Sequence, residues 1–382
     1  MAKVSIIMSN YNCEAYIGKA IQSVLNQTYE DFEFIIIDDH STDGSREIID
    51  SFHDVRIKRI YFEQNEHMCF AFNYALKIAV GDYYARIDSD DTWEPEKLEK
   101  QICYMEAHPA CGACFTLVHV VDENDSFLTA EQTDRVTLLE TSNKTQAEWL
   151  RYFYFNGSCL CHPSVVIRRK ALEIAGIYNY SLVQIQDYEL WIRIAKKFDL
   201  YVLQERLTNY RWFMSGKNAS APSLAVNRRS KYEFTYVLSK YFDDIPDALF
   251  IEAFGSDFII PGTTNTNELQ CEKALLLLRP VFCGHCPKIG GMEKLITLLQ
   301  NDVTREILRN KYYVTQKNFY ELSASCILDE METEHMKMVE SRQGMLNRVR
   351  AELSLKDKIW LIIPPIVWNS LSKVYRVFVK RR

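Results

Sequence analysis

The sequence predicts an α/β protein with a mainly parallel sheet between layers of helix, followed by a helical C-terminal region. Over residues 1–88, short apolar segments typical of strands alternate with segments whose apolar residues recur at helical spacing. The apolar run FIIID is continuous rather than alternating, which supports a strand buried on both faces of a sheet. Much of residues 225–355 instead repeats apolar residues every three or four positions, as amphipathic helices do.

The first β-α unit is expected to have a strand over residues 3–9 and a helix over residues 14–28. KVSIIMS is rich in β-branched and aliphatic residues, and the segment after it places apolar residues at helical spacing. Further strands are expected over residues 32–39, 56–62 and 82–88, and further helices over residues 45–52 and 70–80. Strands joined by helices of this length lie parallel in one sheet.

Composition and charge limit the class of protein. The chain has 382 residues, of which 47% are hydrophobic and 25% charged, which suits a globular protein large enough for two domains. The formal net charge of -6 argues against a nucleic-acid binder, which needs a surplus of lysine and arginine. The start, MAKVSIIMSNYN, lacks the apolar core of a signal peptide, so we expect a cytoplasmic protein with reduced, mostly buried cysteines.

Polar and acidic residues follow three of the predicted strands. Ligands of parallel sheets bind beyond the carboxyl ends of the strands, where loops and helix starts gather. Helix capping explains one or two of the residues after the second strand, but not the whole set. The residues at this edge are Asn10, Tyr11 and Asn12 after the first strand, Asp38 and Asp39 after the second, and Asp88 after the fourth.

Two common phosphate-binding motifs do not fit the sequence. A dinucleotide-binding fold needs glycines in the first β-α turn, and MSNYNCEAY has none. SGKNAS contains Gly216 and Lys217 but lacks the upstream glycine and the following hydroxyl of a P-loop. Any phosphate must therefore be bound in another way.

The segment YYARIDSDDTWEP carries three carboxylates that repel one another. A divalent cation offsets such a cluster, and oxygen ligands suit Mg²⁺ or Mn²⁺, which usually take one or two carboxylates and complete their shell with water and substrate phosphates. Asp88 and Asp90 lie two residues apart at a strand end, where a turn can aim both at one ion. We expect these two residues to be metal ligands.

Six motifs, in order along the chain, resemble those of family 2 glycosyltransferases. They are VSIIMSNYN, IIIDDHSTDGS, GDYYARIDSDD, PEKLEKQ, HPSVVIRRKAL and QDYELWIR, and the resemblance spans roughly residues 1–215. It implies the GT-A fold, a nucleotide-diphospho-sugar-binding fold with a central mixed sheet. It also implies sugar transfer with inversion at the anomeric carbon.

The resemblance assigns residues to the nucleotide base of the donor. Ser9 and Tyr11 are expected to line the base pocket, and Asp39 is expected to accept a hydrogen bond from the base. A planar ring and one acceptor carboxylate at neighbouring strand ends also suit the imide edge of a uracil. A UDP-sugar is therefore the expected donor.

The same resemblance gives roles to the acidic segment. Asp88 corresponds to the residue that contacts the ribose and the metal, and Asp90 to the main metal ligand. Asp91 is the next carboxylate of the donor site and is expected to orient either of them. The family often has an arginine where this chain has Phe72, and Arg86 is expected to take over its contact with the diphosphate.

Asp187 is the general base that the resemblance implies. It lies where a helix is expected to begin, and it would take the proton of the acceptor hydroxyl as that hydroxyl attacks the sugar opposite the leaving diphosphate. A favourable interaction with the helix dipole is the alternative role for an acid there. Gln186 replaces a glutamate common in the family, and Glu189 is a second candidate for the base.

A further departure from the family lies after Tyr210. The family often has a histidine after the YR pair, whereas this chain has Trp212 and Phe213. Lys217 is the candidate substitute for that histidine. His162, in CHPSVV, is expected to be a packed structural residue rather than a ligand.

The FCGHCPK segment has the cysteine spacing of thiol-disulfide oxidoreductases. Cys283 and Cys286 lie in a region expected to be helical rather than directly after an early strand, so we expect buried structural thiols. A zinc site is the alternative, with the ligands Cys271, Cys283, His285 and Cys286.

Three regions are expected along the chain: a catalytic domain over residues 1–219, a helical region over 220–355 and a basic amphipathic tail over 356–382. Within the helical region, the apolar spacing of GMEKLITLLQNDVTREIL predicts a helix over residues 291–308.

The tail combines a short apolar core with many basic residues. The core from Ile359 to Trp368 is shorter than the about 20 residues that span a bilayer, and Pro364 and Pro365 break a helix inside it. We expect the tail to bind an anionic membrane surface, with packing against the helical region as the alternative. Its basic residues are Lys356, Lys358, Lys373, Arg376, Lys380, Arg381 and Arg382.

Together these observations predict an inverting glycosyltransferase that transfers a hexosyl or N-acetylhexosaminyl group. The donor is a nucleotide-diphospho-sugar, and the acceptor is a hydroxyl of a glycan or lipid-linked glycan used in cell-surface polysaccharide synthesis. The protein is expected in the cytoplasm, peripheral on the inner face of the cell membrane. The competing hypothesis is a non-catalytic sugar-nucleotide-binding or scaffold protein.

Overall fold

The computed structural model describes residues 3–216, 218, 221 and 223–324. Met1–Phe319 form one compact unit and Tyr320–Arg382 a second, so the predicted boundary near residue 219 lies inside the first unit and stays a prediction. The predicted tail lies outside the described residues. Among the described helices, none combines the length and the hydrophobicity that crossing a membrane requires.

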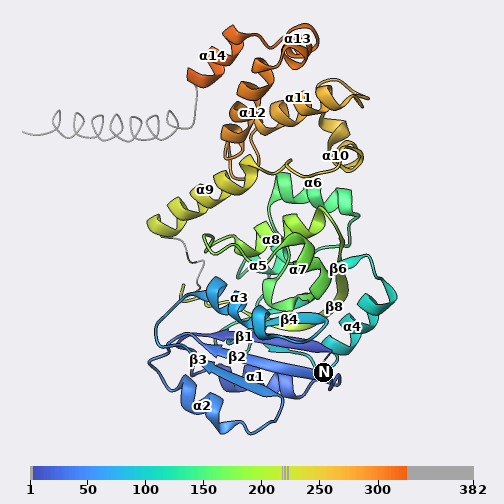
Figure 1. Cartoon of the computed structure of the whole chain (residues 1–382). Helices are drawn as coiled ribbons and strands as arrows, with labels where there is room; N and C mark the ends of the chain where they lie inside the picture. The colour runs from blue at the N-terminus through green and yellow to red at the C-terminus, as the bar shows by residue number, and fades with distance from the viewer. Residues whose placement is uncertain (1–2, 217, 219–220, 222, 325–382) are drawn as a thin grey trace, which may run out of the picture. The chain divides into compact units, whose positions relative to one another are not determined.

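The described residues form one sheet of eight strands, in the order β3-β2-β1-β4-β7-β6-β8-β5 (Figure 1). β1 pairs in parallel with β2 and β4, and β2 pairs in parallel with β3, as predicted from the alternation of strands and helices. β7 is antiparallel to β4 and β6, while β8 is parallel to β6 and antiparallel to β5. The strands are β1 Val4–Asn10, β2 Phe32–Asp38, β3 Ile57–Tyr61, β4 Tyr83–Asp88, β5 Thr92–Trp93, β6 Cys111–Val121, β7 Val166–Arg168 and β8 Asp199–Arg211.

Each face of the sheet packs against its own hydrophobic core, because successive side chains of a strand point to opposite faces. Ile6 and Met8 of β1 lie in a core with residues of α1, α2 and α4, whereas Ile7 lies in a core with residues of α3, α6, α7 and α8. Figure 1 shows these helices on both sides of the strands, which confirms the predicted α/β class. The helices are α1 Ile17–Leu25, α2 Ser45–Ser51, α3 Met68–Ile78, α4 Lys97–Ala107, α5 Arg135–Leu138, α6 Gln146–Asn156, α7 Arg169–Ala175 and α8 Gln186–Ala195, with a 3-10 turn η1 at His162–Ser164.

The region after β8 is helical, as predicted, and shares a core with the sheet. On α6, Tyr154 packs against Tyr241, Phe242 and Phe254, and this aromatic cluster continues the core that contains α3 and α8. The Tyr241 hydroxyl also donates a hydrogen bond to the Leu150 carbonyl at 2.6 Å. The helices here are α9 Leu224–Ser239, α10 Asp247–Phe254, α11 Thr266–Leu277, α12 Lys288–Gln300, α13 Asp302–Lys311 and α14 Gln316–Ala324, with a 3-10 turn η2 at Gly255–Asp257.

The prediction of one continuous helix over residues 291–308 is wrong. α12 ends at Gln300 and α13 begins at Asp302, on either side of Asn301. The Asn301 side chain accepts the backbone N–H groups of Val303 at 3.0 Å and Thr304 at 3.2 Å, which caps α13. The apolar spacing continues across the break, so periodicity alone could not reveal it.

Candidate active site

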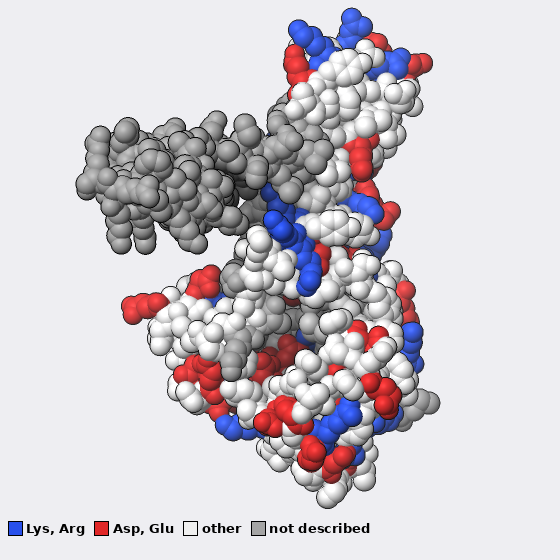
Figure 2. Space-filling model, turned by 90° about the vertical axis from the view of Figure 1, so that its left-hand side faces the viewer, with Lys and Arg blue, Asp and Glu red and all other residues white. Residues whose placement is uncertain are grey.

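The strand register brings the predicted edge residues together. Asn10 lies beside Asp38 in the pairing of β1 with β2, and Ser9 lies beside Asp88 in the pairing of β1 with β4. These strands are parallel, so their carboxyl ends meet at one edge of the sheet. On the face shown in Figure 2, Asp and Glu side chains gather in and around a hollow in the lower part of the molecule.

Asp38 organises the loops at this edge. It is fully buried, and its carboxylate accepts hydrogen bonds from Asn10 Nδ2 at 2.8 Å and Arg46 Nε at 2.6 Å. The backbone N–H of Ser41 donates to the same carboxylate at 3.0 Å. Burial alone would raise the pKa of Asp38, but the hydrogen bonds from Ser41 and Arg46 hold it below its ordinary value. Asp38 therefore fixes the ends of β1 and β2.

Asp39 lies beside the segment that precedes α3. Its Oδ1 accepts the backbone N–H of Glu66 at 2.7 Å, and burial raises its pKa. Ser9 is half-buried at the end of β1, and the Tyr11 side chain is 53% exposed in the following loop. The roles of these three residues in binding a nucleotide base stay predictions.

Three connections at this edge contain left-handed backbone at residues other than glycine. The φ angles are 50° at Asn12, 67° at His40 and 66° at His67, which follow β1, follow β2 and precede α3. Asn12 is held in place, because its N–H donates to Ser41 Oγ at 2.9 Å and its Oδ1 accepts the Thr42 N–H at 2.7 Å. Such backbone costs energy and clusters at functional sites, which supports a ligand site at this edge.

The negative charges of the acidic segment after β4 are only partly offset by neighbouring groups. Burial and the neighbouring Asp88 raise the pKa of Asp90 to about 6. Asp91 is 1% exposed, and its Oδ1 accepts the backbone N–H of Arg211 at 2.7 Å. Nε of Arg211 donates to the Asp90 carbonyl oxygen at 2.8 Å, so β8 holds this turn in place. Asp91 thus has a structural contact with β8. Its role toward the donor stays a prediction.

The binding of a single divalent cation by Asp88 and Asp90 stays a prediction. The negative charge of Asp88 contributes to the raised pKa of Asp90. A cation between the two carboxylates would offset this repulsion. In the part of the chain that the structure describes, no group of three or more His, Cys, Asp or Glu side chains is placed to hold a metal ion. An ion held by these two carboxylates would take its other ligands from water and substrate, as Mg²⁺ and Mn²⁺ commonly do.

Arg86 is a buried positive charge next to this pair. Its guanidinium donates to Asp88 Oδ1 from Nε at 3.0 Å and from Nη2 at 2.7 Å, and it also contacts the ring nitrogens of His162. The guanidinium carbon lies 4.3 Å from the ring centroid of Phe72, the residue that stands where the family often has an arginine. These contacts support orientation of Asp88 by Arg86, while its contact with a diphosphate stays a prediction.

Asp187 lies in the first turn of α8, where the charges of both Arg86 and Asp88 affect it. Burial raises the pKa of Asp187, and Arg86 opposes that rise. His162 Nδ1 is 4.0 Å from Asp187 Oδ2, and burial together with Arg86 holds the pKa of His162 well below its ordinary value. His162 is therefore a neutral, packed residue between Arg86 and Asp187, and its ring also meets the Tyr178 hydroxyl at 2.7 Å.

The two other polar residues at the start of α8 differ in their surroundings. Glu189 forms an ion pair with Arg193 through two hydrogen bonds of 2.7 Å, so its carboxylate is already occupied. Gln186 is 6% exposed, and its Oε1 has no hydrogen-bond partner among the described residues. Of the two candidate bases, Asp187 and Glu189, only Glu189 has its carboxylate paired with an arginine of its own helix, which favours Asp187.

An exposed aromatic cluster lies between α3 and the segment before α8. The ring centroid of Phe70 is 5.8 Å from that of Phe62 and 6.2 Å from that of Tyr180, and Tyr74 is 5.5 Å from Phe62. Phe70, Tyr74 and Tyr180 are 38%, 37% and 51% exposed. Phe70 and Tyr74 lie on α3, which also supplies Phe72 to Arg86, and Tyr180 lies in the segment before α8.

The structure also describes the predicted cysteine pair and Trp212, which follows Arg211 at the end of β8. The thiol of Cys286 and burial raise the pKa of Cys283, which disfavours the thiolate that redox chemistry needs. The zinc alternative lacks support, since no three-ligand group occurs in the described chain. Trp212 packs under Arg135, whose guanidinium carbon is 4.6 Å from its ring centroid. Lys217 lies outside the described residues.

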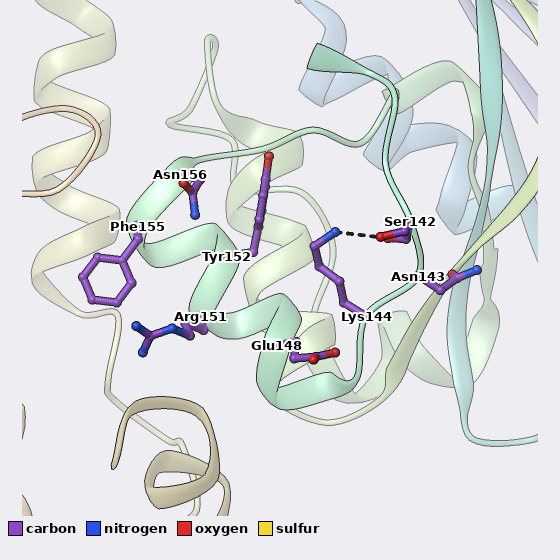
Figure 3. A pocket seen from close by; sticks show the side chains of 8 residues that line it. All are labelled: Ser142, Asn143, Lys144, Glu148, Arg151, Tyr152, Phe155 and Asn156. Carbon is purple, nitrogen blue, oxygen red and sulfur yellow. Dashed lines mark hydrogen bonds between the residues drawn. The ribbon is translucent and has the colours of Figure 1, made fainter. Parts of the chain in front are cut away.

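A pocket of about 470 Å³ lies away from the predicted residues, along α6 (Figure 3). Its two basic side chains already have partners: Lys144 Nζ donates to the Ser142 carbonyl at 3.1 Å, and Arg151 pairs with Asp257. We therefore assign this pocket no part in the site. It is lined by Ser142, Asn143, Lys144, Glu148, Arg151, Tyr152, Phe155 and Asn156.

Comparison with known proteins identifies the family. Residues 5–174 match the model of glycosyl transferase family 2. An uncharacterized glycosyltransferase of Methanocaldococcus jannaschii is 33% identical over 213 residues, which cover 54% of this chain and 70% of that relative. The chain belongs to glycosyltransferase family 2.

Family 2 membership confirms the resemblance found in the motifs. An Escherichia coli relative, named UDP-Glc:alpha-D-GlcNAc-diphosphoundecaprenol beta-1,3-glucosyltransferase WfgD, is 46% identical over 196 residues, covering 50% of this chain and 70% of the relative. The crystal structure of TarS from S. aureus matches with a TM-score of 0.51 at 16% identity, over 84% of this chain and 54% of that chain. The likeness to TarS shows the fold, and the family 2 chain therefore has the predicted GT-A fold.

Two residues that hold segments of the candidate site were not identified from the sequence. Arg211, which is 3% exposed, holds the backbone of the acidic turn, and the YR pair in NYRWF was the only local signal for it. Glu233 on α9 contacts the segment before α8, and no motif marks it.

Proposed function

We propose that the protein is an inverting glycosyltransferase that moves a hexosyl or N-acetylhexosaminyl group from a UDP-sugar to a hydroxyl of a lipid-linked glycan. One observation carries the proposal: Arg86 donates to Asp88 at 2.7 Å and contacts His162, whose Nδ1 is 4.0 Å from Asp187 Oδ2 at the start of α8. The WfgD relative, named for transfer from UDP-Glc to a diphosphoundecaprenol-linked sugar, supports this donor and acceptor class. The product would serve cell-surface polysaccharide synthesis.

In this proposal the donor binds at the carboxyl ends of β1, β2 and β4. Ser9 and Tyr11 line the base pocket, and Asp39 accepts a hydrogen bond from the base. Asp88 and Asp90 would hold Mg²⁺ or Mn²⁺, which when bound stabilises the negative charge that develops on the leaving diphosphate.

Asp187 acts on the acceptor in this proposal. Its ionised carboxylate takes the proton of the acceptor hydroxyl while the hydroxyl oxygen bonds to the anomeric carbon. The bond from that carbon to the diphosphate breaks on the opposite side, so configuration inverts and the nucleoside diphosphate leaves. Burial raises the pKa of Asp187 and so makes it a stronger base, while Arg86 favours its ionised form.

The exposed aromatic cluster of α3 and the segment before α8 suits the glycan part of the acceptor. Exposed rings such as Tyr180 and Phe70 offer flat apolar surfaces on which the C–H faces of sugar rings can pack. Tyr180 lies in the segment that leads into α8, whose first turn contains Asp187.

Release of nucleoside diphosphate tests the proposed reaction. Purified protein with Mn²⁺ is incubated with a panel of UDP-, GDP- and dTDP-sugars, and free nucleoside diphosphate is measured. We expect UDP to be released slowly to water and faster when a lipid-linked glycan acceptor is added. A protein that binds a UDP-sugar but releases no UDP with any acceptor would instead be the binding or scaffold protein.

We further propose that the protein works in the cytoplasm, attached peripherally to the inner face of the cell membrane. The support is the composition of residues 356–382, with seven basic residues and one acid in a chain of net charge -6. A lipid-linked acceptor is confined to a membrane surface, so an attached enzyme would meet it more often.

A further inference from the structure

Glu233 connects the helical region to the segment that carries the proposed base. It lies on α9, is 1% exposed, and accepts three backbone N–H groups. Oε1 accepts from Val183 at 3.0 Å, and Oε2 accepts from Gln184 at 2.9 Å and Ile185 at 3.1 Å. These three residues directly precede α8, whose first turn contains Asp187.

The contact anchors the chain where it enters α8: of the three bonded N–H groups, that of Ile185 belongs to the helix terminus, and those of Val183 and Gln184 precede it. Backbone N–H groups at a helix start have no partner inside the helix, and a side chain at the N-cap usually satisfies them. The N-cap residue of α8 is Ile185, which makes no side-chain cap hydrogen bond. A carboxylate makes stronger hydrogen bonds than a neutral acceptor, and negative charge is favourable at this end of a helix.

Neighbouring contacts fix α8 from the same side. The ring of Phe234, next to Glu233, is 5.8 Å from the ring of Tyr188, the residue after Asp187. The Tyr188 hydroxyl in turn donates to the Phe153 carbonyl at 2.6 Å. The first turn of α8 is thus held by α9 through its backbone and through an adjacent side chain.

We propose that Glu233 is a positioning residue for the transfer reaction: by holding residues 183–185, it sets where Asp187 stands relative to the acceptor hydroxyl. The inference rests on the proposed role of Asp187 as the base. Glu233 lies on α9, in the helical region and beyond the residues that match the family model. The proposal therefore gives the helical region a part in the reaction.

The substitution Glu233→Gln tests this role with little change in shape. The amide keeps one acceptor oxygen, but its NH2 group must face at least one of the three backbone donors. Glu272 offers a matched control, since it is also 1% exposed and lies in the same helical region on α11. Its carboxylate accepts the backbone N–H groups of Ile259 and Ile260, both at 2.9 Å, and that segment carries no proposed site residue.

Two measurements on the full chain separate positioning from general stability. Hydrogen exchange of residues 183–185, followed by mass spectrometry, reports the anchor itself without any assay of activity. Turnover and UDP binding are then measured at a temperature at which both variants are folded. We expect Glu233→Gln to speed exchange at 183–185 and to lower kcat about 10- to 100-fold, with the Kd for UDP within about twofold of wild type. Glu272→Gln should change neither, although both variants lower the Tm.

Unchanged exchange at residues 183–185 in Glu233→Gln would overturn the anchor. Faster exchange with a kcat equal to that of Glu272→Gln would overturn the positioning role. A wild-type protein that transfers no sugar would refute the proposed function instead, and the exchange result would still decide whether Glu233 anchors the segment.

Discussion

Asp90 carries a clear electrostatic signal at the candidate site. Burial and the neighbouring Asp88 raise its pKa to about 6 from the ordinary value of 3.8. The raised value means that the folded protein binds a proton there more tightly than the unfolded chain does. In the metal-free protein, this shift therefore lowers stability as the pH rises from about 4 to about 6.

Protons and a divalent cation are therefore predicted to compete at Asp90. Below pH 6 or so the carboxyl is protonated and cannot ligate an ion, so metal affinity should fall about tenfold for each pH unit below the pKa. Mn²⁺ should raise the Tm clearly at about pH 7.5 and little at about pH 5. Thermal unfolding with and without Mn²⁺ measures this, and Asp90→Asn should abolish the increase. An increase in Tm of the same size at both pH values would contradict the assignment.

The partners of single residues were harder to predict than their identities. The acidic segment and Asp187 could be selected from the sequence because motifs of known order mark them. The hydrogen bond between Asp91 and Arg211 could not be predicted, because the two residues are 120 positions apart and no local pattern links them. The contact between Glu233 and Val183, which are 50 positions apart, could not be predicted for the same reason.

Among the elements, the early β-α units followed directly from local patterns. The strands expected over residues 32–39 and 82–88 match β2 Phe32–Asp38 and β4 Tyr83–Asp88 closely, since each is a mainly apolar segment that ends in acids. Helix ends were less accurate: the helix expected over residues 14–28 is α1 Ile17–Leu25, because helix ends depend on local hydrogen bonds more than on apolar spacing.

The later strands were not predicted individually. β6 Cys111–Val121 pairs with β8 Asp199–Arg211, a segment far away in the sequence. The pairing also contains register shifts near Thr116 and Leu117. Short strands such as β7 Val166–Arg168 offer too few residues for a periodic pattern. Tertiary pairing, rather than local preference, determines these elements.

Across the whole molecule, the catalytic and helical regions are expected to act together at a membrane. The hydrophobic core that contains Trp191 of α8 continues to Leu238 of α9 and Phe250 of α10. The helices therefore support α8 directly, which is consistent with a single working unit rather than an independent appendage.

The proposed membrane attachment makes a separate prediction. Full-length protein should co-sediment with vesicles that contain anionic lipid at low salt, with each basic residue of the tail contributing about 1 kcal/mol, and should dissociate at high salt. A form that ends near Ser354 should stay in solution and still release UDP from the donor. Neutral vesicles are the control. Full-length protein that ignores anionic vesicles at low salt would rule out the peripheral location.

The central claim is that Asp187 is the base of an inverting transfer, and Asp187→Asn tests it most directly. Asparagine has the same shape but cannot take the proton of the acceptor hydroxyl. Transfer to the lipid-linked acceptor and binding of UDP are measured side by side for the variant and the wild type. The account predicts that the variant binds UDP with a Kd within about twofold of wild type and transfers sugar about 10²- to 10⁴-fold more slowly. Full transfer by Asp187→Asn would contradict it.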